Sequence, residues 1–183
     1  MGASFVAYNA ASGPVTPFVF QDNFNRGAGV STGLGTNWDS TAIIAQDNYA
    51  MGSTDGSAYV SAGAHTFGSN QYVQFQPYSW GNGKSYHLYL RGGLCHMVWP
   101  TLTGSNLSMR VYDANVFDTT IVPLIYDVVR FEAFGAILRI KLNGTTVWTG
   151  TSTNTSGSIV GQPGFGMSTN QLADNFECGD LLA

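Results

Sequence analysis

Charged side chains are scarce in this sequence. Lysine, arginine, aspartate and glutamate together make up 10% of its 183 residues, whereas an average soluble domain carries about 25%. Only two glutamates are present, Glu132 and Glu177. Hydrolysis of a glycosidic bond needs two carboxylates on either side of the bond, and the three histidines lie in no recognisable nucleophile or triad motif. We therefore predict that the protein is not an enzyme and has no catalytic residues.

Basic clusters and long apolar runs are lacking as well. Seven Lys and Arg residues face eleven Asp and Glu residues, for a net charge of −4. Without a basic stripe there is little counterion release to drive binding to nucleic acid. No segment approaches the roughly 20 apolar residues of a membrane span, and residues 1–17 lack the basic and apolar regions of a signal peptide. We expect a soluble protein made in a cytoplasm, with neither nucleic acid nor a membrane as partner.

Cysteine and histidine, the usual zinc ligands, are few. Cys95 and Cys178 are predicted to be small buried apolar residues, with a disulfide as the alternative. His87 and His96 flank a predicted hairpin and could meet across it. The spacings C-x-x-C and H-x-x-x-H are absent, so the pattern does not predict a zinc site.

Calcium is the remaining metal alternative. Asp113, Asn115 and Asp118 bring hard oxygen ligands into one loop, which is the chemistry that calcium needs. Aspartate and asparagine also gather in loops for conformational reasons alone, and the spacing matches no defined calcium loop. We predict no metal and no cofactor, and keep these three residues as calcium candidates.

What the sequence does contain is turn residues and short alternating segments. Glycine occurs 23 times, and apolar residues recur with period two rather than at helical spacing, which predicts strands and very little helix. Short strands at spacings near 8 to 12 residues are typical of a sandwich or a barrel. The predicted strands are Phe18–Phe20, Ile43–Ala45, Tyr49–Met51, Ala58–Val60, Gln71–Gln76, Tyr86–Arg91, Leu94–Trp99 and Leu107–Tyr112.

Residues 127–150 allow a residue-by-residue prediction. A two-residue turn at Gly135-Ala136 places Phe134 opposite Ile137, Ala133 opposite Leu138, Glu132 opposite Arg139 and Phe131 opposite Ile140. One face of this hairpin is then apolar, and the other carries an opposite-charge pair. The next turn, Asn143-Gly144, is a strong hairpin signal, and it pairs Ile140 with Val147 and Arg139 with Trp148.

The chain divides into an arm and a domain. Residues 1–17 contain no charged side chain and include two prolines, which predicts an extended arm. Phe5 and Tyr8 are costly to leave in water, so we expect the arm to dock on a partner or on the domain itself. Residues 18–183 are predicted to form one domain.

Two sequence signatures resemble concanavalin A-like (laminin G-like) jelly-roll domains. The first is Asp22–Arg26 followed by Leu34–Trp38; the second combines the hairpin at 127–144 with the ending Gly161–Gly164 and Ala173–Phe176. The resemblance covers roughly residues 20–181 and implies an antiparallel two-sheet jelly-roll sandwich whose first and last strands are neighbours. The glutamates match no Glu-x-Asp-x-x-Glu motif of glucanase relatives.

The resemblance also implies two functions. Jelly rolls with this opening and ending are found in bacteriophage virion proteins, which suggests a capsid decoration (cement) subunit located in the virion. It would be a homo-oligomer, with a trimer favoured, bound to the major capsid protein or other virion proteins. The alternative is a lectin-like module that binds carbohydrate for host or glycan attachment.

Candidate binding residues follow from exposure and aromatic character. Trp38, Trp99 and Trp148 are expected to fill the core, as large aromatic side chains normally do. Trp80 lies in a glycine-rich turn, so we predict that Tyr78, Trp80 and Asn82 form an exposed platform for a partner or a glycan. Phe5 and Tyr8 of the arm complete the predicted binding residues.

Overall fold

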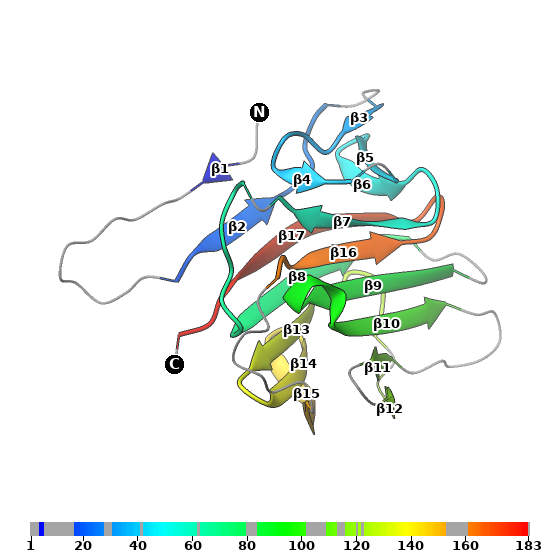
Figure 1. Cartoon of the computed structure of the whole chain (residues 1–183). Helices are drawn as coiled ribbons and strands as arrows, with labels where there is room; N and C mark the ends of the chain where they lie inside the picture. The colour runs from blue at the N-terminus through cyan, green and yellow to red at the C-terminus, as the bar shows by residue number, and fades with distance from the viewer. Residues whose placement is uncertain are drawn as a thin grey trace.

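The computed structural model describes residues 4–5, 17–27, 31–40, 42–61, 63–79, 84–101, 109–112, 116–119, 121, 123–152 and 161–182. Over these ranges the chain is an all-β sandwich of two antiparallel sheets (Figure 1), and its only helical element is one 3-10 turn, Arg91–Gly93. No helix there has the length and apolar character needed to cross a membrane. The predicted fold class is confirmed.

Sheet A contains ten strands in the described ranges, in the order β15-β14-β13-β8-β17-β6-β5-β3, with β2 also paired to β17 and β1 paired to β2. These strands are β1 (Ser4–Phe5), β2 (Val19–Asp22), β3 (Ser31–Gly33), β5 (Ile43–Gln46), β6 (Tyr49–Gly52), β8 (Gln71–Pro77), β13 (Val129–Phe134), β14 (Ile137–Leu142), β15 (Thr145–Thr151) and β17 (Leu172–Asp180).

Sheet B contains seven strands in the same ranges, in the order β12-β11-β10-β9-β16-β7-β4. They are β4 (Trp38–Asp39), β7 (Gly56–Val60), β9 (Lys84–Leu90), β10 (Cys95–Thr101), β11 (Arg110–Tyr112), β12 (Val116–Asp118) and β16 (Gly164–Met167). The turn between β9 and β10 is the 3-10 turn, in which Gly92 and Gly93 both adopt positive φ.

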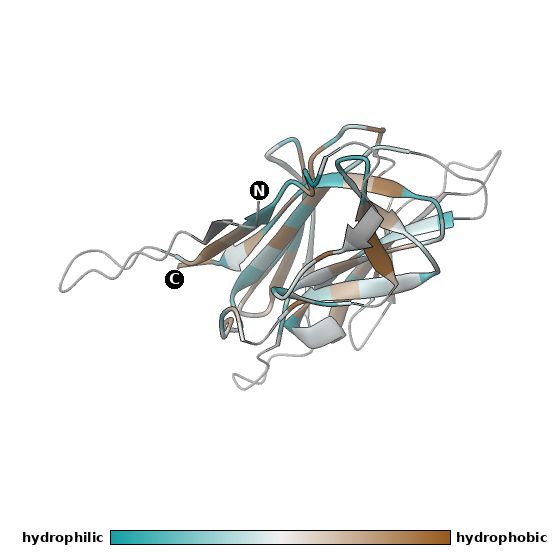
Figure 2. Ribbon diagram, turned by 90° about the horizontal axis from the view of Figure 1, so that it is seen from above, coloured by the Kyte–Doolittle hydropathy of each residue, from teal (hydrophilic) through white to brown (hydrophobic). Residues whose placement is uncertain are grey.

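The core lies between the two sheets and is built from alternate residues of each strand. Apolar and polar bands succeed one another along the strands in Figure 2, as the pleat requires when one face of each sheet is buried. At its centre Trp38 packs against Phe20, Phe165 and Phe176, with ring centroids 4.8–5.3 Å apart. Trp148 is half-buried and packs against the same core, while the side chain of Trp99 lies outside the described residues.

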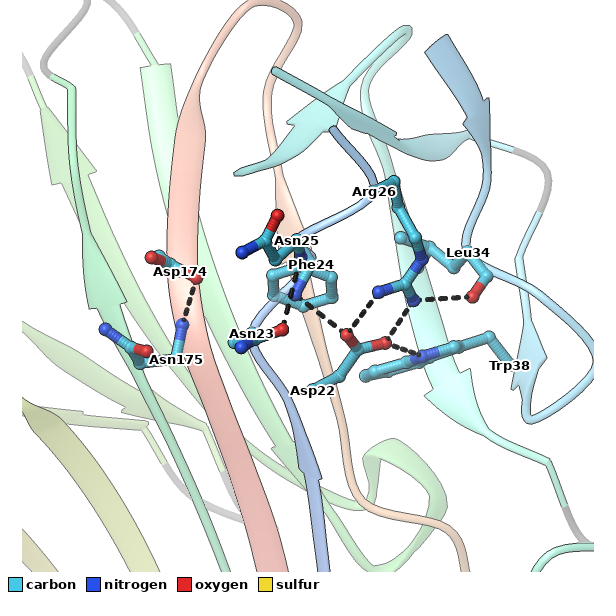
Figure 3. A network of polar contacts seen from close by, with 9 residues as sticks. All are labelled: Asp22, Asn23, Phe24, Asn25, Arg26, Leu34, Trp38, Asp174 and Asn175. Carbon is cyan, nitrogen blue, oxygen red and sulfur yellow. Dashed lines mark hydrogen bonds and ion pairs between the residues drawn. The ribbon is translucent and has the colours of Figure 1, made fainter. Parts of the chain in front are cut away.

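The Asp22 carboxylate, at the start of the domain, is the centre of a hydrogen-bond network that holds neighbouring segments together (Figure 3). The buried Asp22 carboxylate accepts hydrogen bonds from the backbone N–H of Phe24 at 2.8 Å and from the indole N–H of Trp38 at 3.0 Å. Both guanidinium nitrogens of Arg26 also donate to it, at 3.0 and 2.8 Å. One carboxylate therefore holds together the residues that carry the first sequence signature, and their role is structural.

The first and last strands are neighbours, as the resemblance implied. Phe176 of β17 lies opposite Asp22 of β2, and Cys178 lies opposite Phe20. Ser4 and Phe5 of the arm pair in turn with Gln21 and Phe20 of the same β2 strand. The arm thus adds a short strand to sheet A at these two residues.

Within residues 127–150, the register predicted for the first hairpin is confirmed. Phe134 lies opposite Ile137, and Glu132 lies opposite Arg139. The pairing predicted for the next strand was wrong, because Ile140 lies opposite Trp148 rather than Val147. A β-bulge between Ile140 and Lys141 leaves Val147 as an extra residue, and this shift turns the larger Trp148 toward the core.

The two cysteines are both free and fully buried. Cys95 belongs to sheet B and Cys178 to sheet A, and each packs in the apolar core. Burial raises the pKa of the Cys178 thiol well above its ordinary value. This confirms the prediction of small buried apolar residues.

Candidate functional site

The most distinctive surface in the described chain is the outer face of sheet B, the face that points away from sheet A. Along β9 the side chains of Tyr86, Leu88 and Leu90 are buried in the core. Successive side chains of a strand point to opposite faces, so His87 and Tyr89 lie on the outer face. The same alternation places His96 outside on β10 and Tyr112 outside on β11.

Five half-buried rings on this outer face form what we call the aromatic ladder: Tyr59, His87, Tyr89, His96 and Tyr112. Tyr59 and Tyr89 have centroids 5.2 Å apart, and Tyr89 and His96 are 5.7 Å apart. His96 stacks on Tyr112 at 4.6 Å with an interplanar angle of 9°. His87 lies beside the row, 5.8 Å from Tyr89 and 6.3 Å from His96.

Strand register explains why the rings form a straight row. Gly164 of β16 lies opposite Tyr59 on one side and opposite Tyr89 on the other. His96 lies opposite both Tyr89 and Tyr112. The row therefore crosses five neighbouring strands at a right angle to them. At a strand spacing of about 4.8 Å the two end strands lie roughly 19 Å apart. The row of rings is shorter, because Tyr59 and Tyr89 lean together over β16.

Glycine at position 164 allows the rings of Tyr59 and Tyr89 to contact each other over β16. A Cβ atom placed there would come within 2.8 Å of Cδ1 of Tyr59 and within 2.3 Å of the Ala58 backbone oxygen. Gly166, two residues on, would bring a Cβ atom within 2.9 Å of the Tyr89 hydroxyl. The two outward positions of β16 carry no side chain, so the tyrosine rings from β7 and β9 meet above this strand.

The ladder is uncharged at neutral pH. Burial, helped by the neighbouring His96, lowers the pKa of His87 to about 4. Burial also lowers the pKa of His96 and raises the pKa of Tyr89 to about 12. Nε2 of His87 hydrogen-bonds to the Ser85 hydroxyl at 2.8 Å, and its buried Nδ1 has no partner in the described part of the chain. The surface thus offers the outer edges of stacked rings together with neutral hydrogen-bonding groups.

The depressed pKa of His87 makes stability depend on pH. The unfolded chain binds a proton at His87 with a pKa of 6.5, the folded chain only near 4. Between these values the unfolded state holds more protons, so the free energy of unfolding is expected to fall as the pH drops. Denaturant unfolding from about pH 7 to pH 4.5 measures this fall. The variant His87→Gln should show a shallower dependence; an unchanged one would contradict the assignment.

Among the described residues, the charged groups near the ladder lie at its margins, and Asp39 of β4 is the cross-strand partner of Tyr59 at one end. The Arg110 guanidinium is 3.5 Å from the Tyr112 hydroxyl. Asp55 accepts hydrogen bonds from the backbone N–H and the hydroxyl of Thr169, and these lower the pKa of its carboxyl. The carboxylate of Asp55 therefore already accepts hydrogen bonds from Thr169.

Tyr78, the described member of the binding platform predicted from the sequence, lies away from the ladder. Tyr78 follows β8 of sheet A and is 38% exposed. Its ring contacts Tyr49 at 4.2 Å and Tyr126 at 5.2 Å, and not the ladder. Trp80, Asn82 and Tyr8 lie outside the described residues, as does the side chain of Phe5. Their binding role stays a prediction.

Two places in the sequence carry candidate metal ligands. Within the described ranges no three His, Cys, Asp or Glu side chains are grouped so as to hold a metal ion. Cys95 is fully buried, on the face of β10 opposite to His96. Asp113 and Asn115 lie outside the described residues and only the backbone of Asp118 lies within them. The prediction of no metal, and calcium as its alternative, therefore both stay untested at this loop.

The two glutamates lie on the outer face of sheet A, on the other side of the molecule from the ladder. Glu132 pairs with Arg130 at 2.7 Å and with Lys141 at 2.9 Å. The predicted cross-strand partner, Arg139, is 3.9 Å away. Glu177 accepts hydrogen bonds from the Tyr72 hydroxyl at 2.7 Å and from the Gln21 amide at 2.6 Å.

Sequence reasoning missed the ladder although part of its signal was present. The segment from Tyr86 to Leu90 carries aromatic residues on both of its faces, which a strand with one solvated face does not need. The alternation of Gly164 and Gly166 was a second signal, because it indicates close approach above that strand.

Comparisons with known proteins support the fold. Neither a known protein family nor a curated protein matches the sequence. Among solved structures, a β-1,3-1,4-glucanase (lichenase) from a mouse hindgut metagenome has a TM-score of 0.56 at 11% identity, over 90% of this chain and 99% of that one. The carbohydrate-binding module CBM66 from Bacillus subtilis has a TM-score of 0.51 at 17% identity, over 76% and 92%.

A third similar structure is a Bacillus subtilis protein of unknown function with a galectin-like fold, with a TM-score of 0.52 at 9% identity over 80% of this chain and 91% of that one. At these identities the similarity shows the fold alone. The chain has the galectin-like, concanavalin A-like jelly-roll fold.

Proposed function

We propose that this protein is a lectin-like module that binds carbohydrate on the outer face of sheet B, through the aromatic ladder. The observation that carries the proposal is the row in which Tyr59, Tyr89, His96 and Tyr112 lie side by side in strand register. Phenol and imidazole groups can hydrogen-bond to sugar hydroxyls, and the carbon atoms at the outer edges of the stacked rings can pack against the apolar faces of sugar rings.

The length of the row favours an extended glycan over a single sugar. From Tyr59 through Tyr89 and His96 to Tyr112, successive ring centroids lie 5.2, 5.7 and 4.6 Å apart, so the row is longer than one sugar ring. The ladder carries no charge at neutral pH, so uncharged sugars suit it better than acidic ones. Solved structures with this fold include a carbohydrate-binding module, which supports the proposal of carbohydrate binding.

Binding is better supported than hydrolysis, although a glucanase is also among the similar structures. A glycosidase needs two carboxylates about 5–9.5 Å apart at the sugar. The ladder itself contains none, and both glutamates lie on the opposite sheet in ion pairs or hydrogen bonds. The proposed module therefore holds a glycan without cleaving it.

A role as a capsid decoration subunit stays a prediction from the sequence. None of the solved structures named above is a virion protein, and the expected capsid partner, the trimer and the location in the virion rest on the resemblance alone. A decoration subunit that also grips a host glycan would satisfy both expectations. The glycan-binding proposal can be tested without reference to a virion.

The test is a glycan-binding screen with the full-length protein, followed by titration of a glycan that binds. We expect Tyr89→Ala to weaken binding roughly 30-fold, because aromatic residues at the centre of a binding surface commonly contribute 2 kcal/mol or more. Tyr78→Ala is the matched control, a tyrosine replaced on the other sheet, and should bind as the wild type does.

Two results would overturn the proposal. One is a screen in which no glycan binds; the other is loss of binding in Tyr78→Ala while Tyr89→Ala binds normally, which would return the site to the platform predicted from the sequence. Repeating the titration with a chelator separates the calcium alternative. We expect no change, and a loss of binding would implicate Asp113, Asn115 and Asp118.

A further inference from the structure

A second candidate site lies on the outer face of sheet A, where strands β13 and β14 collect positive charge. Arg130, Arg139 and Lys141 line a cavity of about 350 Å³ together with Glu132. These three are among only seven basic residues in a chain with a net charge of −4. The local charge thus has the opposite sign to that of the whole protein.

The three cations differ in how many protein groups they contact. The Arg130 guanidinium is 2.7 Å from Glu132, lies 3.5 Å above the Tyr72 ring and donates to the Gln74 side chain. Lys141 also contacts Glu132, at 2.9 Å. Arg130 and Lys141 together more than balance the single charge of Glu132.

Arg139 is the cation whose N–H donors are most accessible to a ligand. Its guanidinium is 3.9 Å from Glu132, beyond hydrogen-bond distance, and its side chain is 37% exposed. No hydrogen bond to it is found within the described part of the chain. A guanidinium carries five N–H donors in a planar fork that matches a carboxylate.

The other wall of the cavity is apolar. It is formed by Phe134 at the end of β13 and by Leu181 and Leu182, which follow β17. Leu182 is 52% exposed, so this wall is open to solvent. A cationic wall facing an apolar wall suits a ligand with one charged end and one apolar end.

We propose that this cavity binds a monoanionic carboxylate attached to an apolar group, with the carboxylate on Arg139 and Lys141 and the apolar group against Phe134, Leu181 and Leu182. Among the described residues, three cations face two carboxylates here once Glu177, 4.0 Å from Arg130, is counted, which leaves an excess of one positive charge. One excess charge matches a monoanion better than a phosphate or sulfate dianion. The volume is at the low end of the range for small-molecule sites, about 300–1,000 Å³.

The test is a calorimetric or NMR titration of the full chain with octanoate. Octanamide lacks the charge and sulfate lacks the apolar chain, so we expect both to bind at least tenfold more weakly than octanoate. Arg139→Gln should weaken octanoate binding at least tenfold, because it removes the charged donor of a charge-assisted pair. Arg110→Gln, an exposed arginine on the other sheet, is the control and should bind octanoate normally.

The variant Leu182→Ser tests the apolar wall independently, and because the residue is exposed its folding should be unaffected. We expect several-fold weaker octanoate binding with no change in melting temperature. Peptides that end in leucine with a free or an amidated carboxyl group distinguish a free acid from a chain terminus as the source of the carboxylate. Absence of octanoate binding, or equal binding of octanamide, would overturn the proposal. Neither outcome bears on the glycan site, which lies on the other sheet.

Discussion

Replacing Asp22 by asparagine is expected to lower the free energy of unfolding by about 3–5 kcal/mol, the usual cost of removing one partner from a buried ion pair. Asp22 is buried and accepts hydrogen bonds from Phe24, Arg26 and Trp38. Asparagine offers a single acceptor oxygen and turns an amide donor toward groups that are themselves donors. The Arg26 charge, largely shielded from water, then loses its counterion.

Urea unfolding followed by tryptophan fluorescence measures this loss. Asp39→Asn is the control, since Asp39 is exposed on β4, and its effect should stay within about 0.5 kcal/mol. A double-mutant cycle with Trp38→Phe sharpens the test, because residues that share one carboxylate should give non-additive changes. Additive effects, or a loss no larger than that of the control, would show that the hydrogen-bond network of Asp22 does not stabilise the fold.

The variant Phe165→Ala is expected to cost a similar amount, about 3–5 kcal/mol, by opening a cavity at the centre of the core. Phe165 is completely buried, and its ring lies 5.2 Å from Phe176, 5.3 Å from Trp38 and 5.7 Å from Phe24. It also links the sheets, since it belongs to β16 of sheet B while Phe176 belongs to β17 of sheet A. No small side-chain movement can refill a site surrounded by rigid rings.

Calorimetric unfolding of this variant, with Ile137→Ala as the control, tests the assignment. Ile137 is 37% exposed at the turn of the β13–β14 hairpin, so its truncation should be tolerated. If Phe165→Ala were no more destabilising than Ile137→Ala, the core would have to be centred elsewhere.

Local sequence patterns predicted the parts of the fold that local pairing determines. The register of Phe131 with Ile140 follows from one turn and one alternation, and it is observed. The pairing of Ile140 with Val147 followed the same logic and was wrong, because a bulge depends on how Trp148 packs against distant strands. Turn and alternation patterns contain no information about such packing.

The ladder could not be predicted for a related reason. Tyr59, Tyr89 and Gly164 are far apart in the sequence and meet only because β16 inserts between β7 and β9. The order of strands in a sandwich is non-local information. Tyr78 was singled out because its exposure follows from a nearby turn, which is visible locally.

The bulge in β15 also affects how readily copies of the protein can pair edge to edge. Strand β15 is the last in the order of sheet A, and its seven residues include no charged side chain and no proline. A long uncharged edge of this type can template the addition of further strands and so start aggregation. Here the bulge divides the pairing into Thr145–Thr146 and Trp148–Thr151 and adds local twist. Among the described residues, the edge offers an incoming strand two short offset segments instead of one straight run. We expect this geometry to disfavour amyloid-like growth without a charged gatekeeper residue.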